Sequence, residues 1–279
     1  MSVKNSDDIS DNIKEKYNKL EKNLADMKKV IIAFSGGVDS SFLLKVALDT
    51  LGKENVMAVI ADSQIRFSDN LDKAKNIAQE IGINPLIIET SELNKENFRK
   101  NDEYRCYYCK YELYQRLNEI AKSQNIDYVL DGTNADDLLN ENRPGIKAIK
   151  ELDIKTPLQK AGLKKEEIRK LSKILGLKTW DQPSDTCLAT RFGFNLEINE
   201  DDLNRVERIE NYLQKFDFEQ LRARIHDENT LRIEVLPSEM DKIMKKKDEI
   251  IKRIKKEEFC YITLDLEGYR TGSTEEIKK

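Results

Sequence analysis

The sequence predicts an α/β protein in which a parallel-sheet domain is followed by a small α+β subdomain. Short apolar runs alternate with amphipathic helical patterns through the first two thirds of the chain, which favours a parallel sheet with right-handed crossovers. A loop with two glycines separates the first apolar run from the helix that follows it. From about residue 196 the order changes to helix, two strands, helix and strand. We therefore expect domains over residues 1–195 and 196–279.

The elements of the first domain follow from hydrophobic periodicity. Apolar residues at steps of three and four predict helices, and apolar runs bounded by turn residues predict strands. The expected helices cover residues 8–28, 42–51, 69–81 and 164–175. The expected strands cover residues 30–34, 56–61, 85–89 and 127–130.

The second domain shows a different pattern. A helix is expected over residues 203–213 and a charged helix over residues 238–254. Alternating apolar and polar residues predict strands at 218–225 and 230–236, and an apolar run predicts a last strand at 260–266. This order is typical of a small α+β unit.

The glycine loop after the first strand is suited to binding phosphate. Two glycines allow a tight turn and a close approach of the backbone to a ligand. The next helix offers unpaired N–H groups and the positive end of its dipole. The loop lacks the lysine of a Walker A motif. Its residues are Ser35, Gly36, Gly37, Val38, Asp39 and Ser40.

Polar residues also follow two later strands of the predicted sheet. Ala61, Asp62 and Ser63 end one strand, and the sequence DGTNADD, which contains Gly132 and Thr133, follows another. Because ligands of α/β proteins bind beyond the carboxyl ends of the strands, these segments are candidate contacts for a nucleotide.

Composition narrows the classes of function. Charged residues make up 36% of the chain, but the formal net charge is only −4. This balance argues against a nucleic-acid protein that works through bulk positive charge. No apolar run is long enough to span a membrane, and the N-terminus has no signal-peptide core. We expect a cytoplasmic protein.

The four cysteines are more typical of metal or catalytic chemistry than of disulfides. Cys106 and Cys109 form a C-x-x-C pair, and Cys187 lies 78 residues further on, whereas Cys260 falls in an apolar run. The pair is compatible with a redox dithiol, a structural zinc site or an iron–sulfur cluster with one open iron. It is also compatible with two incidental thiols beside a tyrosine-rich helix.

Six motifs together resemble the LarE family of ATP-dependent sulfur transferases, which are PP-loop ATP-pyrophosphatases. The resemblance implies a PP-loop domain with a smaller C-terminal domain. It also implies that ATP adenylates a carboxylate of pyridinium-3,5-biscarboxylic acid mononucleotide, and that sulfur then displaces AMP during synthesis of the nickel-pincer cofactor of lactate racemase. The motifs are AFSGGVDSSFLLK, RCYYCKYELY, DGTNADD, the RPG of residues 143–145, PSDTCLATR and EGYRTGS.

The resemblance also implies roles for single residues. The glycine loop would bind the pyrophosphate of ATP, with Asp39 on magnesium rather than acting only as a helix cap. Residues 61–63, with Gly132 and Thr133 nearby, would line the adenine pocket. One branch of the family sacrifices the sulfur of its single cysteine. The branch with an added C-x-x-C resembles [4Fe-4S] enzymes, so Cys106, Cys109 and Cys187 would hold a cluster that carries sulfide.

Three arginines are candidate substrate ligands. Arg191 follows Cys187 by four residues, and Arg222 and Arg224 alternate along a predicted strand. Paired guanidinium groups suit phosphate and carboxylates, and the family places substrate phosphate near this strand. A solvated Arg191 and a surface ion-pair role for the other two remain open. The family also implies an external sulfide source and a trimer-based homo-oligomer.

Three other functions compete with this one. A tRNA thiolase would share the loop and the cysteines, but it would normally carry a basic RNA-binding region. Amidation of the kind that NAD and GMP synthetases perform would leave the cysteines without a use. A non-catalytic nucleotide-binding iron–sulfur scaffold would release no pyrophosphate.

Overall fold

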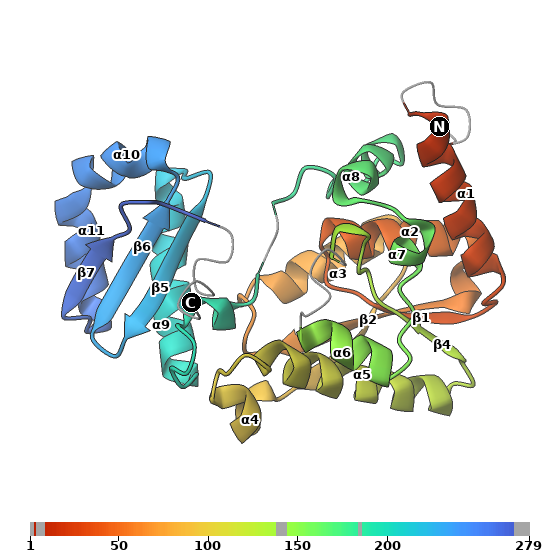
Figure 1. Cartoon of the computed structure of the whole chain (residues 1–279), viewed down its shortest axis with the longest axis horizontal. Helices are drawn as coiled ribbons and strands as arrows, with labels where there is room; N and C mark the ends of the chain where they lie inside the picture. The colour runs from red at the N-terminus through yellow and green to blue at the C-terminus, as the bar shows by residue number, and fades with distance from the viewer. Residues whose placement is uncertain (1–2, 4–8, 138–143, 184–185, 271–279) are drawn as a thin grey trace. The chain divides into compact units, whose positions relative to one another are not determined.

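The computed structural model of this chain describes residues 3, 9–137, 144–183 and 186–270. Two compact units are present (Figure 1). The first comprises Met1–Ser63, Ser68–Thr90 and Cys106–Asp185, and the second comprises Gln64–Phe67, Ser91–Arg105 and Thr186–Lys279. The second unit thus takes two short segments from the N-terminal half of the chain and begins before residue 196. The domain limits expected from the sequence stay a prediction.

The first unit contains a four-stranded sheet in the order β3-β2-β1-β4. Each neighbouring pair is parallel, which confirms the predicted α/β class. The strands are β1 (Val30–Ala33), β2 (Val56–Ser63), β3 (Leu86–Thr90) and β4 (Tyr128–Leu130). The helices of this unit are α1 (Asp11–Ala25), α2 (Val38–Leu51), α3 (Asn70–Ile81), α5 (Arg105–Ser123), α6 (Pro144–Glu151), α7 (Pro157–Ala161) and α8 (Lys165–Ile174).

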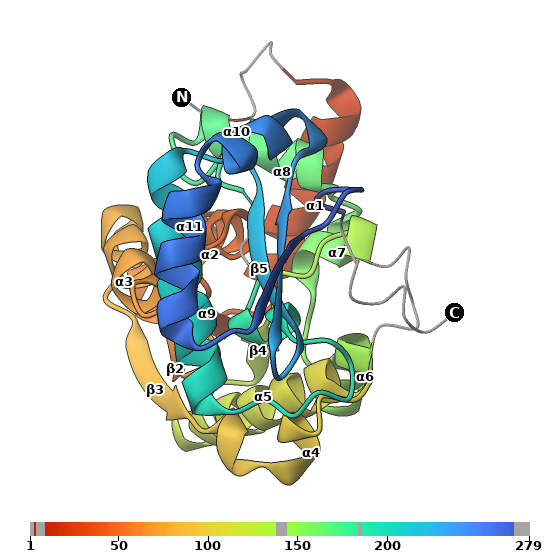
Figure 2. The same cartoon turned by 90° about the vertical axis from the view of Figure 1, so that its left-hand side faces the viewer.

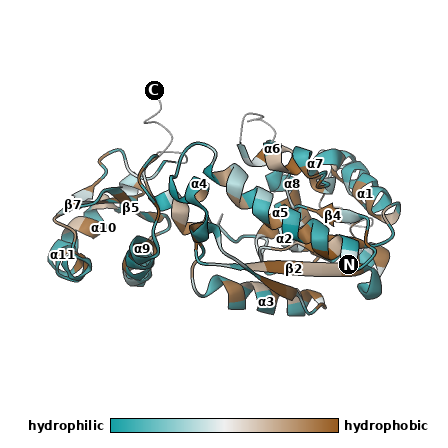
Figure 3. Ribbon diagram, turned by 90° about the horizontal axis from the view of Figure 1, so that it is seen from below, coloured by the Kyte–Doolittle hydropathy of each residue, from teal (hydrophilic) through white to brown (hydrophobic). Residues whose placement is uncertain are grey.

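Helices cover both faces of this sheet, because successive strand residues point to opposite sides. Val30 and Ile32 join a core with α1, α2, α3, α7 and α8. Ile31 joins a second core with α5 and α6. In Figure 3, α1 and α3 alternate between hydrophilic and hydrophobic colours, as expected of helices with one face in a core. The carboxyl ends of the strands therefore remain as the edge where loops can form a site.

The second unit contains a three-stranded sheet in the order β5-β6-β7. β5 and β6 are antiparallel, and β6 and β7 are parallel. Figures 2 and 3 show α9 and α11 on the same face of this sheet. The elements are α4 (Glu96–Arg99), α9 (Glu200–Leu213), β5 (Leu221–Asp227), β6 (Thr230–Val235), α10 (Met240–Lys245), α11 (Lys247–Ile254) and β7 (Tyr261–Leu264).

The charged helix expected over residues 238–254 is interrupted. Lys246 leaves the helical conformation, with φ −109° and ψ 8°. Asp248 and Glu249 then stand in the first turn of α11, where acidic residues stabilise the start of a new helix. Among the described residues, no helix is both long and apolar enough to cross a membrane.

Candidate active site

The glycine loop connects β1 to α2 and is held by its own serines. The Ser35 and Ser40 hydroxyl oxygens lie 3.1 Å apart, and the Ser40 hydroxyl donates to the Gly37 carbonyl at 3.1 Å. The Ser35 hydroxyl accepts from the Gly37 N–H at 3.3 Å. These bonds close the loop over the first turn of α2, so that the helix N-terminus faces the carboxyl edge of the sheet.

Two glycines permit close packing around the loop. Gly36 has φ +77°, and a Cβ there would lie 3.0 Å from the Cα of Ala74 in α3. A Cβ at Gly132 would lie 3.1 Å from the backbone nitrogen of Ser40. The DGTN segment after β4 is thereby brought against the start of α2. The structure thus brings the two predicted nucleotide segments together.

Asp39, in the first turn of α2, is partly buried between a cation and an amide. Its Oδ2 lies 2.6 Å from Lys165 Nζ, and its Oδ1 accepts from Asn134 Nδ2 at 3.5 Å. Burial raises the pKa of Asp39 above its ordinary value, although Lys165 opposes the rise. A carboxylate held in this way, next to a helix N-terminus, can exchange a lysine partner for a metal–phosphate group.

A second loop, after β4, supports this arrangement. The Asn134 side chain accepts from the Asp136 N–H at 2.9 Å, and Asp136 Oδ2 accepts from the Lys165 N–H at 2.8 Å. Asn134 is buried, with 4% of its surface exposed. The acidic residues of DGTNADD therefore hold the start of α8 and place Lys165 against Asp39.

The predicted adenine-pocket residues lie at the carboxyl end of β2. Ala61 and Ser63 are partly buried and Asp62 is exposed. The Asp62 carbonyl accepts from the Thr90 hydroxyl at 3.2 Å, which ties the ends of β2 and β3 together. Their contact with adenine stays a prediction, as does that of Gly132 and Thr133.

The cysteines are distributed over the two units. Cys106 and Cys109 occupy the first turns of α5, three residues apart, so they lie on neighbouring positions of one helix face. Cys187 precedes a short 3-10 helix in the second unit. Cys106 is exposed and the other two are half-buried. Two adjacent thiols of this kind suit a pair of metal ligands.

The part of the chain that the structure describes contains no group of three or more His, Cys, Asp and Glu residues arranged to hold a metal ion. The iron–sulfur ligand set therefore stays a prediction. Cys260 is exposed rather than buried, in contrast to the core position that its apolar neighbours suggest.

Arg191 is a buried ion-pair residue. Only 1% of its surface is exposed. Its Nε and Nη2 donate to the two carboxylate oxygens of Glu210, each at 2.9 Å, and its Nη1 donates to the Thr186 hydroxyl at 2.6 Å. Glu210 also accepts from the Ala223 N–H at 2.8 Å. Arg191 thus joins the segment after Cys187 to α9 and β5.

Arg222 and Arg224, the two arginines on β5, lie in different environments. Arg224 lies 2.8 Å from Glu234, which is fully buried, and donates to the Thr190 carbonyl at 2.8 Å. Arg222 forms no ion pair with any Asp or Glu among the described residues, and its Nη1 donates to the adjacent Leu221 carbonyl. Burial lowers the pKa of Arg222, and the charges of Arg191 and Arg224 lower it further, although the charge of Glu210 opposes them. Arg222 is therefore a cation that an anionic ligand would stabilise.

Sequence reasoning missed three residues of these sites. Lys165 and Asn134 surround Asp39, and Tyr269 lies with its ring 5.2 Å from the Arg222 guanidinium. One signal was present for Lys165: a lysine at the first position of a helix opposes the helix dipole and therefore implies a nearby anion. Tyr269 belongs to the EGYR motif. The glycine of this motif, Gly268, leaves room for the Val235 carbonyl, because a Cβ at Gly268 would lie only 2.7 Å from that oxygen.

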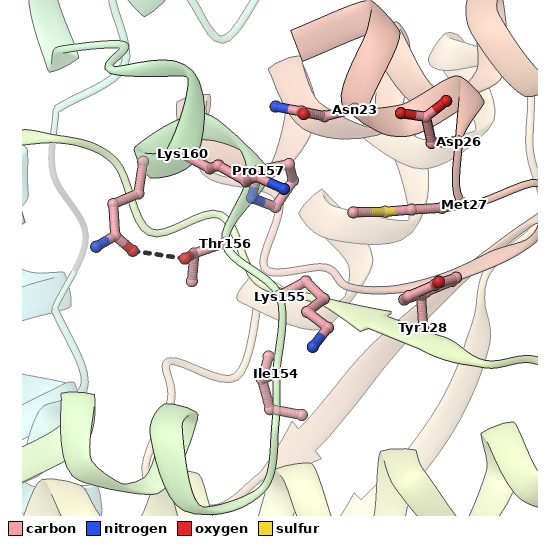
Figure 4. Close-up of a pocket in the computed structure, with 10 residues that line it drawn as sticks. Asn23, Asp26, Met27, Tyr128, Ile154, Lys155, Thr156, Pro157 and Lys160 are labelled. Carbon is pink, nitrogen blue, oxygen red and sulfur yellow. Dashed lines mark hydrogen bonds between the residues drawn. The ribbon is translucent and has the colours of Figure 1, made fainter. Parts of the chain in front are cut away.

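A cavity of about 560 Å³ lies elsewhere in the first unit, between the end of α1, β4 and the start of α7 (Figure 4). Its lining residues include Tyr128, Lys155 and Thr156 but none of the residues predicted for nucleotide binding. The binding of a nucleotide at the glycine loop stays a prediction, and this cavity lies apart from that loop.

Comparisons with known proteins cover both units. The family model for NAD synthase matches residues 7–130. An uncharacterized protein of Synechocystis is 38% identical over 95% of this chain and 98% of its own length. The pyridinium-3,5-bisthiocarboxylic acid mononucleotide synthase of Lactiplantibacillus plantarum is 35% identical over 89% of this chain and 90% of its own length. A glutamine-dependent NAD(+) synthetase of Aquifex aeolicus is 37% identical, but over only 28% of this chain and 14% of its own length.

Proposed function

We propose that this chain, which belongs to the LarE family of PP-loop proteins, is an ATP-dependent sulfur insertase acting on pyridinium-3,5-biscarboxylic acid mononucleotide. The observation that carries the proposal is the extent of the similarity to the Lactiplantibacillus synthase, which covers 89% of this chain and so reaches both units. The similarity to an NAD synthetase, by contrast, is confined to 28% of the chain.

The first half of the reaction would be adenylation. A carboxylate oxygen of the substrate attacks the α-phosphorus of ATP, and pyrophosphate leaves. The N-terminus of α2 and the loop N–H groups would hold the pyrophosphate. Asp39 would hold magnesium, which when bound offsets the phosphate charge. Lys165, which pairs with Asp39, would add positive charge beside the same phosphates.

In the second half, a sulfur nucleophile attacks the acyl carbon and AMP leaves with its electron pair, which gives the thiocarboxylate. We propose that Cys106, Cys109 and Cys187 supply three thiolates to a [4Fe-4S] cluster, which when bound would carry the sulfide. The C-x-x-C spacing of Cys106 and Cys109, together with Cys187 in the PSDTCLATR motif, supports this ligand set.

Arg222 would bind a phosphate or carboxylate of the substrate, because it has no acidic partner among the described residues and its neighbours include further cations. Arg191 and Arg224 would act on the substrate mainly by adding positive charge and by holding the segment after Cys187, since their own donors already bond to Glu210, Glu234 and backbone carbonyls. This division refines the expectation that all three arginines bind substrate.

We also propose that the chain forms a trimer-based homo-oligomer. Light scattering after size-exclusion chromatography would test this proposal.

Anaerobic reconstitution with iron and sulfide tests the sulfur route. We expect iron and acid-labile sulfide to bind, and each Ser variant of Cys106, Cys109 and Cys187 to lose most of it, while Cys260→Ser keeps it. We also expect more than one thiolation per chain when sulfide is supplied. Dehydroalanine at position 187 after a single turnover would instead show that Cys187 gives up its own sulfur.

The match to the NAD synthase model supports one alternative, in which ammonia attacks the adenylate. Supplying ammonia and sulfide in parallel separates the two reactions, because the products differ in mass. Pyrophosphate release that yields neither an amide nor a thiocarboxylate would contradict both. A chain that releases no pyrophosphate under any of these conditions would be a non-catalytic scaffold.

A further inference from the structure

Asp131, the residue that follows β4, lies between the cysteine-bearing helix and the nucleotide loop. Its Oδ2 accepts from the hydroxyl of Tyr114 in α5 at 2.7 Å. Its Oδ1 accepts from the backbone N–H of Thr133 at 2.8 Å, and the Thr133 hydroxyl donates to the same oxygen. One carboxylate therefore connects α5 to the segment that carries Gly132.

The α5 side of this connection is close to the cysteines. Tyr114 is buried, with 1% of its surface exposed. Lys110, the residue after Cys109, places its Nζ 5.7 Å from the centre of the Tyr114 ring. A Cβ at Gly145 would lie 3.1 Å from Lys110 Cδ and 3.8 Å from the Cys106 carbonyl, so the start of α6 packs directly on this turn of α5.

The loop side is close to the phosphate-binding groups. Gly132 lies between Asp131 and Thr133 and packs against the backbone of Asp39 and Ser40, where a Cβ on Gly132 would come within 3.1 Å of the Ser40 nitrogen. Any shift of residues 131–133 would therefore move the surface on which the first turn of α2 rests.

The charge state of Asp131 is consistent with a fixed anchor. Burial alone would raise its pKa, but the charge of Lys110 and the hydrogen bonds from Thr133 and Tyr114 together hold the pKa below its ordinary value. Burial and the neighbouring Asp131 raise the pKa of Tyr114 well above its usual value. The pair thus remains an ionised acceptor and a protonated donor at neutral pH.

We propose that Asp131 is a positioning residue that fixes α5, through Tyr114, to the nucleotide loop, so that binding of ATP orders the turn that carries Cys106 and Cys109. This inference rests on the nucleotide site described above and adds to it a connection to the cysteine helix. The connection has a purpose in a two-step reaction, because the sulfur donor should be ordered only when the adenylating nucleotide is in place.

Tyr114→Phe tests the connection with little change in shape. Tyr111→Phe is its matched control, because Tyr111 lies on the same helix and packs against Tyr107 rather than Asp131. We expect Tyr114→Phe to weaken Mg-ATP binding by roughly 3- to 10-fold, as measured by isothermal titration calorimetry. This is less than the full free energy of a hydrogen bond to a charged group, because only part of that energy affects nucleotide binding. Asp131→Asn should weaken it further, and Tyr111→Phe should leave it unchanged.

Amide hydrogen exchange provides the second measurement, because a merely structural role would not link the two regions. In the wild-type chain and in Tyr111→Phe, Mg-ATP should slow exchange both at residues 131–134 and in the first turns of α5. In Tyr114→Phe, the slowing should persist at residues 131–134 and be lost in α5.

The outcomes separate this inference from the proposed function. A wild-type chain that binds no Mg-ATP would overturn the nucleotide site and the inference with it. A wild-type chain that binds Mg-ATP, with Tyr114→Phe indistinguishable from Tyr111→Phe in both measurements, would overturn the inference alone. If Asp131→Asn fails to fold, the two tyrosine variants still decide between these outcomes.

Discussion

The glycine loop of the first unit and the arginine cluster of the second unit, which comprises Arg191, Arg222 and Arg224, differ in how their residues are paired. Ser35, Gly37 and Ser40 bond to one another within six consecutive residues, so the shape of the loop is specified by a short stretch of sequence. Arg191 and Arg224, in contrast, bond to Glu210 and Glu234, which come from separate elements. A contiguous motif thus fixes its own geometry, whereas buried arginines depend on which acidic residues the fold brings beside them.

This contrast predicts that the largest loss of activity comes from Asp39. Asp39→Asn keeps the size of the side chain but removes the charge that would hold magnesium. We expect pyrophosphate release in the presence of substrate to fall by roughly 100-fold or more, the scale at which one preorganised charge contributes to a transition state. Asp49→Asn on the same helix, whose partner is Lys45, is the control and should be near wild type. Equal activities would remove Asp39 from the mechanism.

A sharper test of the arginine cluster compares Arg222 with Arg191. Arg222→Met should raise the KM for the mononucleotide roughly 10-fold while the thermal midpoint changes little, because Arg222 has no acidic partner to lose among the described residues. Arg191→Met should instead lower the thermal midpoint, since it leaves Glu210 buried without its cation. If Arg222→Met destabilises the fold and leaves KM unchanged, the division between the ligand-binding and structural arginines is wrong.

Lys165 provides a test with a smaller effect, on pH dependence. The proposed magnesium site requires the Asp39 carboxylate to be ionised. Burial raises the pKa of Asp39, and Lys165 lowers it. Removing the lysine therefore raises the pKa of Asp39 further. Lys165→Met should move the acid limb of pyrophosphate release to higher pH and reduce the rate at neutral pH by roughly 10-fold. Lys170→Met, an exposed position on α8, should leave the profile in place; a shift in both variants would point to bulk charge instead.

The same contrast explains what the sequence could and could not predict. The parallel sheet, the loop and the DGTN segment are local patterns, and all were predicted. The pairing of Lys165 with Asp39 joins residues 126 positions apart, and nothing in the periodicity of either helix specifies it. The environment of Arg191 could not be predicted either. Its burial depends on Glu210, and the sequence does not distinguish Glu210 from the other charged residues of an amphipathic helix. The break at Lys246 was missed because lysine is compatible with a continuing helix.

The smallest expected effect concerns stability in the second unit, where Glu257 accepts from Arg208 at 2.7 Å and from Arg253 at 2.6 Å. Burial would raise the pKa of Glu257, but these two arginines hold it below its ordinary value. A depressed folded pKa contributes stability above the ordinary glutamate pKa of about 4.3, and this contribution is lost as the pH falls through the folded value.

Glu257→Gln should therefore lower the free energy of unfolding at pH 7 by about 1 kcal/mol, a modest value because Arg208 is half-exposed. The loss should shrink as the pH falls below about 4, where the wild-type carboxylate is itself protonated. Urea unfolding at pH 7 and below about pH 4 measures how much the loss of stability differs between the two pH values. Glu258→Gln, at an exposed neighbouring position, is the control. A loss of equal size at both pH values would mean that Glu257 stabilises the fold through packing rather than through its charge.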